Sequence, residues 1–186
     1  MKIVSFRTTP SGPIHTGALI GSPSEARDDA SSEVLDFDAP GADLPERGTD
    51  PCAWFDLGGA HLPRARALWA EASADPDRLS RLRTAGAVHR RIEIHLTAPV
   101  PRPGKVLCIG LNYKDHAAET KMALPERPLL FSKFPTSVIG PGAPVRLPPG
   151  SERSDYEAEL CVVVGRRATR VPVEEADHHV LGYANF

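Results

Sequence analysis

The sequence predicts an α+β protein, with a small N-terminal α+β domain over residues 1–98 and a β-rich second part over residues 99–186. The first observation is that the best helical pattern lies early in the chain, at residues 62–84, whereas the apolar runs after residue 105 are continuous and strand-like. The second is the segment between them, TAPVPRPGK (residues 97–105), whose three prolines and glycine are typical of a linker.

Short apolar segments predict the strands of the N-terminal domain. They lie at residues 1–7, 14–20, 34–37 and 88–96. In the last of these, apolar and polar residues alternate with one exception at Arg90, which predicts a single half-buried strand.

One helical segment completes the N-terminal domain. Between residues 62 and 84, apolar side chains recur at the spacing of a helix face: Leu62, Ala65, Leu68, Trp69 and Ala72. We expect Pro76 to split this segment into two helices, because proline cannot donate the backbone hydrogen bond of a helix interior.

The second part of the chain begins with a continuous apolar run at residues 106–110, which predicts a buried strand. Asn112 is a favoured N-cap for a short helix in NYKDHAAETK. The remaining elements expected in this part are strands at residues 129–134, 145–147 and 156–164 and a short helix at residues 173–180.

The bulk properties exclude several classes of partner. The hydrophobic content of 41% and charged content of 25% are ordinary for a globular protein, and the net charge of −2 gives no basic face for nucleic acid. No apolar run approaches the length of a membrane span, and the N-terminus lacks the long apolar core of a signal peptide. Three cysteines without a CxxC motif suit a reducing compartment, so we expect a cytoplasmic protein.

Two carboxylates stand at the start of the predicted strand at residues 156–164. Because strand side chains alternate, Glu157 and Glu159 would share one face about 6.6 Å apart. They can converge on a hard cation, for which oxygen ligands favour Mg²⁺, Mn²⁺ or Ca²⁺ over zinc. The alternative is an exposed strand end with two solvated acids.

Two further groups of residues have both a catalytic and an ordinary interpretation. His116 and Glu119 are three residues apart on a predicted helix, where a carboxylate can orient an imidazole that serves as a base. An ion pair on the helix surface is the alternative. Lys133 ends the alternation Leu129, Phe131, Lys133, and its ammonium group either neutralises an anionic substrate or simply reaches solvent.

In this order, the segments KVLCIGLNYKDHAAET, RPLLFSKFPTSVIGPGAPVRLP, DYEAELCVVVGRRA and ADHHVLGYANF resemble the fumarylacetoacetate hydrolase family over residues 99–186. The resemblance implies that the second part is the beginning of a β-rich catalytic β-roll and the first part an accessory domain. It also implies a divalent cation, Mg²⁺ or Mn²⁺, held by Glu157 and Glu159. His116 and Glu119 would activate water or move protons, and Lys133 would assist at the substrate.

The activity implied by the resemblance is metal-dependent hydrolysis of a C–C bond in a small 2,4-dioxo acid of the acylpyruvate or fumarylacetoacetate kind. Relatives with the same residues act as isomerases, decarboxylases or lyases on related oxo-acids, and a non-catalytic fragment is a further alternative. The family also implies a homodimer for the complete protein.

The family's third metal ligand is an aspartate that follows the Gly-Tyr segment, and this sequence stops at GYANF. We therefore expect a truncated chain with an incomplete β-roll. We also expect the isolated polypeptide to fold poorly and to be nearly inactive.

Overall fold

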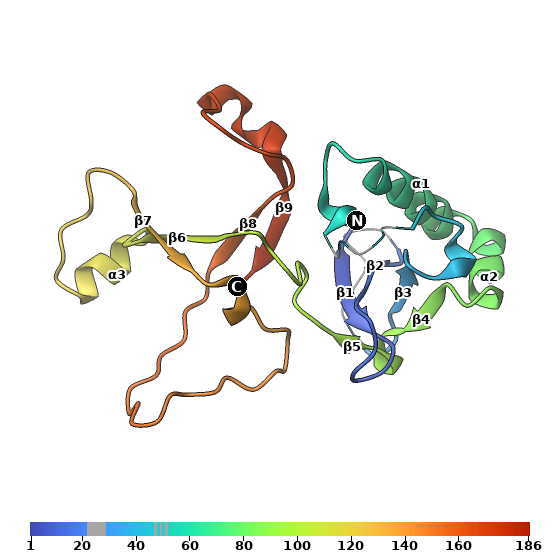
Figure 1. The fold of residues 1–186 in the computed structure, drawn as a ribbon, viewed down its shortest axis with the longest axis horizontal. Coiled ribbons are helices and arrows are strands. Elements are labelled where there is room, and N and C mark those ends of the chain that lie inside the picture. The colour runs from blue at the N-terminus through green and yellow to red at the C-terminus, as the bar shows by residue number, and fades with distance from the viewer. Residues whose placement is uncertain (22–28, 47, 49, 51) are drawn as a thin grey trace. The chain divides into compact units, whose positions relative to one another are not determined.

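The computed structural model describes residues 1–21, 29–46, 48, 50 and 52–186, and it confirms the α+β architecture (Figure 1). The described chain divides into two compact units, residues 1–101 with 140–186, and residues 102–139. The proposed domain limits of 1–98 and 99–186 stay a prediction.

A five-stranded antiparallel sheet forms the N-terminal part, with the strand order β4-β3-β2-β1-β5. The strands are β1 (Ile3–Arg7), β2 (His15–Leu19), β3 (Glu33–Asp36), β4 (Val88–Arg90) and β5 (His95–Leu96). The first three agree with the alternating apolar segments of the sequence.

The prediction of one strand over residues 88–96 is wrong. The 3₁₀ turn Arg91–Glu93 interrupts the segment directly after Arg90, where the alternation of apolar and polar residues also fails. β4 pairs with β3, whereas β5 pairs with β1 at the opposite edge of the sheet. A continuous strand could not reach both edges, so the chain turns between them.

Two helices occupy the segment predicted to be helical, α1 (His61–Ala74) and α2 (Pro76–Thr84). Asp75 separates them, and its carboxylate accepts hydrogen bonds from the backbone N–H groups of Asp77 and Arg78, which caps α2. Pro76 occupies the first turn of α2, where its missing N–H costs nothing. In the part of the chain that the structure describes, no helix is long and apolar enough to cross a bilayer.

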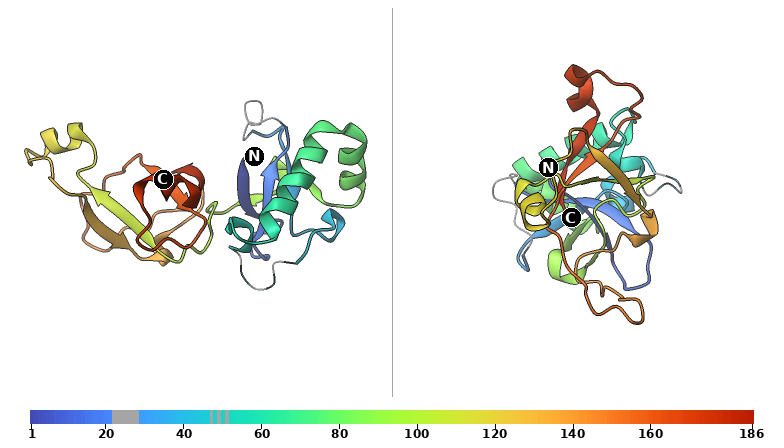
Figure 2. Two further views of the ribbon diagram at one scale, coloured as in Figure 1. Left: turned by 90° about the horizontal axis from the view of Figure 1, so that it is seen from above. Right: turned by 90° about the vertical axis from the view of Figure 1, so that its left-hand side faces the viewer.

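The sheet buries apolar side chains on both faces. On one face Ala18, Leu35 and Phe37 pack with buried residues of α1 and α2, which lie together beside the sheet in Figures 1 and 2. On the other face a smaller cluster contains Phe6, Leu19, Val34 and Ile94. Neighbouring residues such as Ala18 and Leu19 enter different clusters because strand side chains alternate between faces.

The unit of residues 102–139 contains an antiparallel pair, β6 (Val106–Gly110) and β7 (Leu129–Lys133), joined through α3 (Lys114–Glu119). Tyr113, and not Asn112, is the N-cap of α3. β6 was predicted to be buried, but Leu107 and Ile109 are 65% and 49% exposed.

The C-terminal segment folds into an antiparallel hairpin of β8 (Leu160–Val164) and β9 (Val180–Asn185). The predicted strand at residues 156–164 is therefore shorter at its start. The predicted helix at 173–180 is a 3₁₀ helix, Val173–His179, and residues 145–147 form no strand. The apolar side chains Leu160, Val162 and Val164 are about half exposed or more, although the sequence predicted that they face a core.

Candidate functional site

His116 and Glu119 lie on α3, one turn apart, and both side chains are exposed. The backbone of His116 is held by Thr120, whose N–H and hydroxyl both donate to its carbonyl oxygen at 3.0 and 2.8 Å. The side chain of Ala117, the next residue of the helix, is buried. α3 therefore presents an imidazole and a carboxylate to solvent from a fixed backbone.

The connection from β6 into α3 contains a strained residue. Leu111 has a φ of 52°, in the left-handed region. This conformation costs a non-glycine residue about 1–2 kcal/mol. Strain of this kind is often found where a chain must present side chains for function, and here it precedes the helix that carries His116.

Lys133 is the last residue of β7 and pairs with Val106 of β6. Its side chain is exposed, and it shares a strand face with Leu129 and Phe131, which are themselves about half exposed. The ammonium group is thus available to a solute, and the two neighbours give this face an apolar character.

The two predicted metal ligands differ in position. Glu159 directly precedes β8, and its backbone exchanges two hydrogen bonds of 2.9 Å with Phe186, so its half-buried side chain leaves from a fixed strand end. Glu157 is exposed and lies outside the regular strand. The prediction that one strand face carries both carboxylates is therefore wrong for Glu157.

The donor atoms of Glu157 and Glu159 suit a hard cation such as Mg²⁺ or Mn²⁺, which prefers carboxylate oxygens. Across the described ranges, no group of three or more His, Cys, Asp or Glu side chains could hold a metal ion. These two glutamates therefore supply the right kind of ligand but only a partial set.

The predicted residues divide between the two units. His116, Glu119 and Lys133 belong to residues 102–139, whereas Glu157 and Glu159 belong to the unit that also contains the N-terminal sheet.

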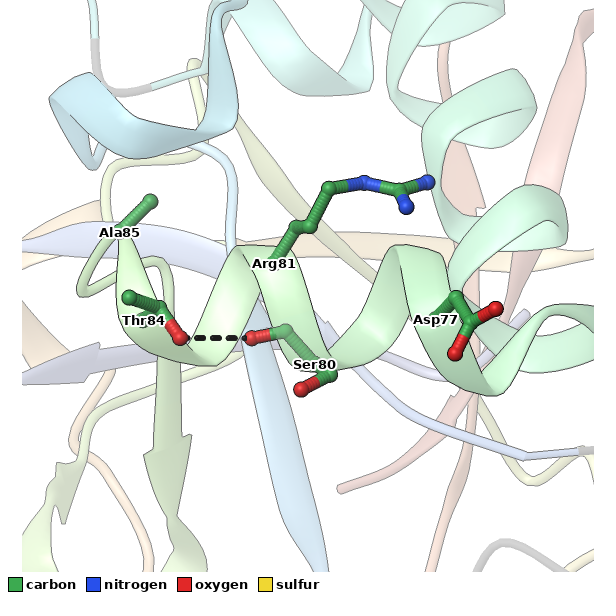
Figure 3. Close-up of a pocket in the computed structure, with 5 residues that line it drawn as sticks. All are labelled: Asp77, Ser80, Arg81, Thr84 and Ala85. Carbon is green, nitrogen blue, oxygen red and sulfur yellow. Dashed lines mark hydrogen bonds between the residues drawn. The ribbon is translucent and has the colours of Figure 1, made fainter.

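A depression on the surface of α2 contains none of the predicted residues. It is lined by Asp77, Ser80, Arg81, Thr84 and Ala85 (Figure 3). The Thr84 hydroxyl donates to the Ser80 carbonyl oxygen at 3.1 Å, a bond within the helix itself. The depression is open, and its lining gives no reason to expect a bound substrate there.

Sequence reasoning missed a polar cluster within the N-terminal sheet. Asp36 of β3 is 1% exposed, and one of its carboxylate oxygens lies 2.7 Å from Nδ1 of His15 and 3.2 Å from Nε2 of His89. The other oxygen accepts the backbone N–H of Asp38 at 2.9 Å. The only hint in the sequence is an acid inside the apolar segment VLDF, because the histidines come from distant strands.

The Asp36 carboxyl has a lowered pKa. Burial alone raises the pKa, but hydrogen bonds from His15 and His89, the charge of His15 and the Asp38 N–H together outweigh burial. The fold therefore favours the ionised carboxylate.

We expect Asp36 to make the stability of the N-terminal sheet depend on pH in acid. Its contribution is present above the unfolded pKa of about 3.9 and is lost as the pH falls through the lower folded pKa. Asp36→Asn should therefore lower the thermal unfolding temperature near neutral pH, and the difference from wild type should shrink below about pH 4. Circular dichroism melts across this range measure it.

Asp43→Asn is the matched control, because Asp43 is exposed and its φ of 54° is well tolerated by asparagine. It should melt like wild type throughout. A difference between Asp36→Asn and wild type that stayed constant down to about pH 2 would show that ionisation of Asp36 does not stabilise the fold.

Comparison with known proteins adds to this geometry. Residues 105–186 match the family described as fumarylacetoacetate (FAA) hydrolase C-terminal. Over 93 residues the chain is 43% identical to the mitochondrial oxaloacetate tautomerase of Xenopus laevis and 44% identical to that of Homo sapiens. These segments cover 50% of this chain and 29% and 30% of the two relatives.

A solved structure shares the fold over the whole chain. The 5-carboxymethyl-2-hydroxymuconate delta-isomerase of Mycobacterium smegmatis has a TM-score of 0.62 and 22% identity, and the match covers 100% of this chain and 53% of that one. The chain thus spans about half the length of this structure and less than a third of the two tautomerases. Over residues 105–186, the chain is similar to the fumarylacetoacetate hydrolase family.

Proposed function

We propose that the protein is an enzyme that moves a proton at the carbon beside the 2-oxo group of a small dicarboxylic oxo-acid, as in the keto–enol interconversion of oxaloacetate. The observation that carries this proposal is that the segment matched by the family, residues 105–186, contains every predicted site residue. The name of the tautomerase relatives, which are 43–44% identical over 93 residues, favours isomerisation as the reaction.

In the proposed reaction, His116 takes a proton from C3 of the substrate. The C3–H electron pair forms the C2=C3 double bond, and the 2-oxo oxygen receives a proton to give the enol, so no atom is lost. Glu119, one turn further along the same helix, orients the imidazole. Lys133 neutralises a substrate carboxylate.

Glu157 and Glu159 would hold the divalent cation. When bound, a cation of this kind stabilises negative charge on the substrate oxygens as a Lewis acid. The half-buried Glu159, fixed by its backbone pairing with Phe186, suits a ligand better than the exposed Glu157, and we expect it to contribute more to affinity.

The second candidate is hydrolysis of a C–C bond in a 2,4-dioxo acid, which the family description favours. Here His116 would take a proton from water, the hydroxide would add to the distal carbonyl, and the C–C bond would break. The resulting enolate would then be protonated. Both reactions need a base and a stabilised enolate, so the same residues serve either one.

Product identification separates the two candidates. The sequence alone predicts a nearly inactive polypeptide, whereas the proposed function predicts that the purified protein, with Mg²⁺ or Mn²⁺, speeds the enol-to-keto conversion of oxaloacetate, followed by ultraviolet absorbance, and leaves an acylpyruvate intact by NMR. Pyruvate and a carboxylic acid from the acylpyruvate would instead support the hydrolase. Neither reaction, with cation binding confirmed, would contradict the proposed function.

A further inference from the structure

Gly165 joins the hairpin of β8 and β9 to the N-terminal part of the same unit. Its carbonyl oxygen accepts the backbone N–H of Leu57 at 2.8 Å, and its own N–H donates to the carbonyl oxygen of His179 at 2.9 Å. The N–H group of Gly165 thus closes the hairpin, and its carbonyl oxygen binds the segment that leads into α1.

The site of Gly165 leaves no room for a side chain. A Cβ atom there would lie 2.7 Å from the carbonyl oxygen of Phe55, 2.8 Å from Cβ of Leu181 and 3.0 Å from Cγ of Leu57. The first of these is a backbone atom, which cannot rotate away as the end of a flexible side chain can. Close packing therefore requires glycine at this position.

A second contact supports the same attachment. Leu181, in β9, is partly buried and packs against the core cluster that contains Trp54, Phe55 and Leu68. The hairpin is thus held by a backbone hydrogen bond at Gly165 and by apolar packing at Leu181.

The strand that ends at Gly165 begins at Glu159. β8 spans Leu160–Val164, so Glu159 and Gly165 are the residues on either side of it. Phe186 pairs with the backbone of Glu159 at one end, and Leu57 bonds to Gly165 at the other. Between these ends β8 pairs with β9 from Leu160 to Val164, with one register irregularity between Val163 and Val164, so hydrogen bonding to β9 links the position of one end to that of the other.

We propose that Gly165 is a positioning residue, which fixes β8 against the N-terminal part of its unit and so sets the position of the Glu159 carboxylate. This role rests on the proposed function of Glu159 as a cation ligand. The N-terminal domain then contributes to cation affinity without supplying a ligand.

The test compares Gly165→Ala with Gly182→Ala. Gly182 lies in β9 of the same hairpin, and a Cβ there would meet nothing within 4 Å. Two quantities are measured on the full chain: the affinity for Mn²⁺, by electron paramagnetic resonance of the free ion, and the hydrogen-exchange rate of the Leu57 amide, by NMR. Tryptophan emission is recorded as well, because both tryptophans lie in the N-terminal domain.

We expect Gly165→Ala to speed exchange at Leu57 and to weaken Mn²⁺ binding by about tenfold or more, as loss of a group that orients a metal ligand does. Tryptophan emission should not change, because the N-terminal core stays folded. Gly182→Ala should match wild type in all three measurements. Wild-type exchange rates and Mn²⁺ affinity in Gly165→Ala would overturn the proposal.

Two more variants keep the outcomes distinct. Leu181→Ala loosens the same contact without inserting an atom, so it should change exchange and Mn²⁺ affinity in the same direction even if Gly165→Ala fails to fold. Unchanged values in Leu181→Ala would count against the positioning role.

Glu159→Gln tests the ligand itself. If wild type binds no Mn²⁺, or Glu159→Gln binds it equally well, the proposed cation site fails and the positioning role with it. If Glu159→Gln alone loses Mn²⁺, only the role of Gly165 is wrong.

Discussion

Replacing His116 by glutamine is expected to reduce turnover of the oxo-acid substrate by about 10²- to 10⁴-fold, the usual contribution of a positioned acid–base group. Glutamine keeps a polar side chain of similar reach but cannot accept and return a proton. The loss should appear in kcat more than in KM, because the imidazole acts on the reacting carbon and not on substrate binding. Steady-state kinetics of the enol-to-keto conversion at saturating Mg²⁺ measure it.

His95→Gln is the control for this prediction. His95 is also an exposed histidine, but it belongs to β5 of the N-terminal sheet and is no part of the predicted site. It should keep wild-type kinetics. Equal activity of His116→Gln and His95→Gln would show that His116 is not the base, whichever reaction the protein performs.

Replacing Trp54 by alanine is expected to cost about 3–5 kcal/mol of folding free energy, as truncation of a fully buried aromatic side chain does. Trp54 is 1% exposed, and its ring lies 5.4 Å from that of Phe37 and 5.1 Å from that of His61. Its indole N–H also donates to the Asp38 carboxylate at 3.0 Å, and truncation removes this hydrogen bond as well. Urea unfolding followed by circular dichroism gives the difference.

Trp54→Phe separates the two contributions. It keeps an aromatic ring in the core and removes only the N–H donor, so it should cost about 1.5–3 kcal/mol, the usual contribution of a hydrogen bond to a charged group. If Trp54→Ala lowered the folding free energy by less than about 1 kcal/mol, Trp54 would not be packed in the core of the N-terminal sheet. Because a domain is stable by only about 5–15 kcal/mol, the alanine variant should unfold at markedly lower urea.

The helices and most strands could be predicted because their signals are local. Apolar spacing from Leu62 to Ala72 defines one face of α1, and Pro76 marks the break between α1 and α2. The failures arise where the outcome depends on pairing with distant strands. The alternation through residues 88–96 fits one strand or two equally well, and only the pairing of β4 and β5 with opposite edges of the sheet decides between them.

In the candidate site, too, the residue types could be predicted from local sequence, whereas their positions depend on strand pairing. The sequence identified His116, Glu119, Lys133, Glu157 and Glu159 as residue types suited to acid–base and cation chemistry. It placed Glu157 on a strand because the pattern DYEAELCVVV alternates. In the structure, the strand that pairs with β9 begins only at Leu160. The bounds of a strand depend on backbone pairing with another segment, which no pattern within one segment specifies.

By itself, the sequence determined the helical and strand periods, the linker composition and the set of chemically capable residues, since each depends on near neighbours in the chain. Only the tertiary structure places Asp36 between His15 and His89. Only it packs Gly165 closely against Phe55, Leu57 and Leu181. These contacts join residues far apart in sequence. They depend on how separate elements pack, and packing is set by shape and volume in three dimensions.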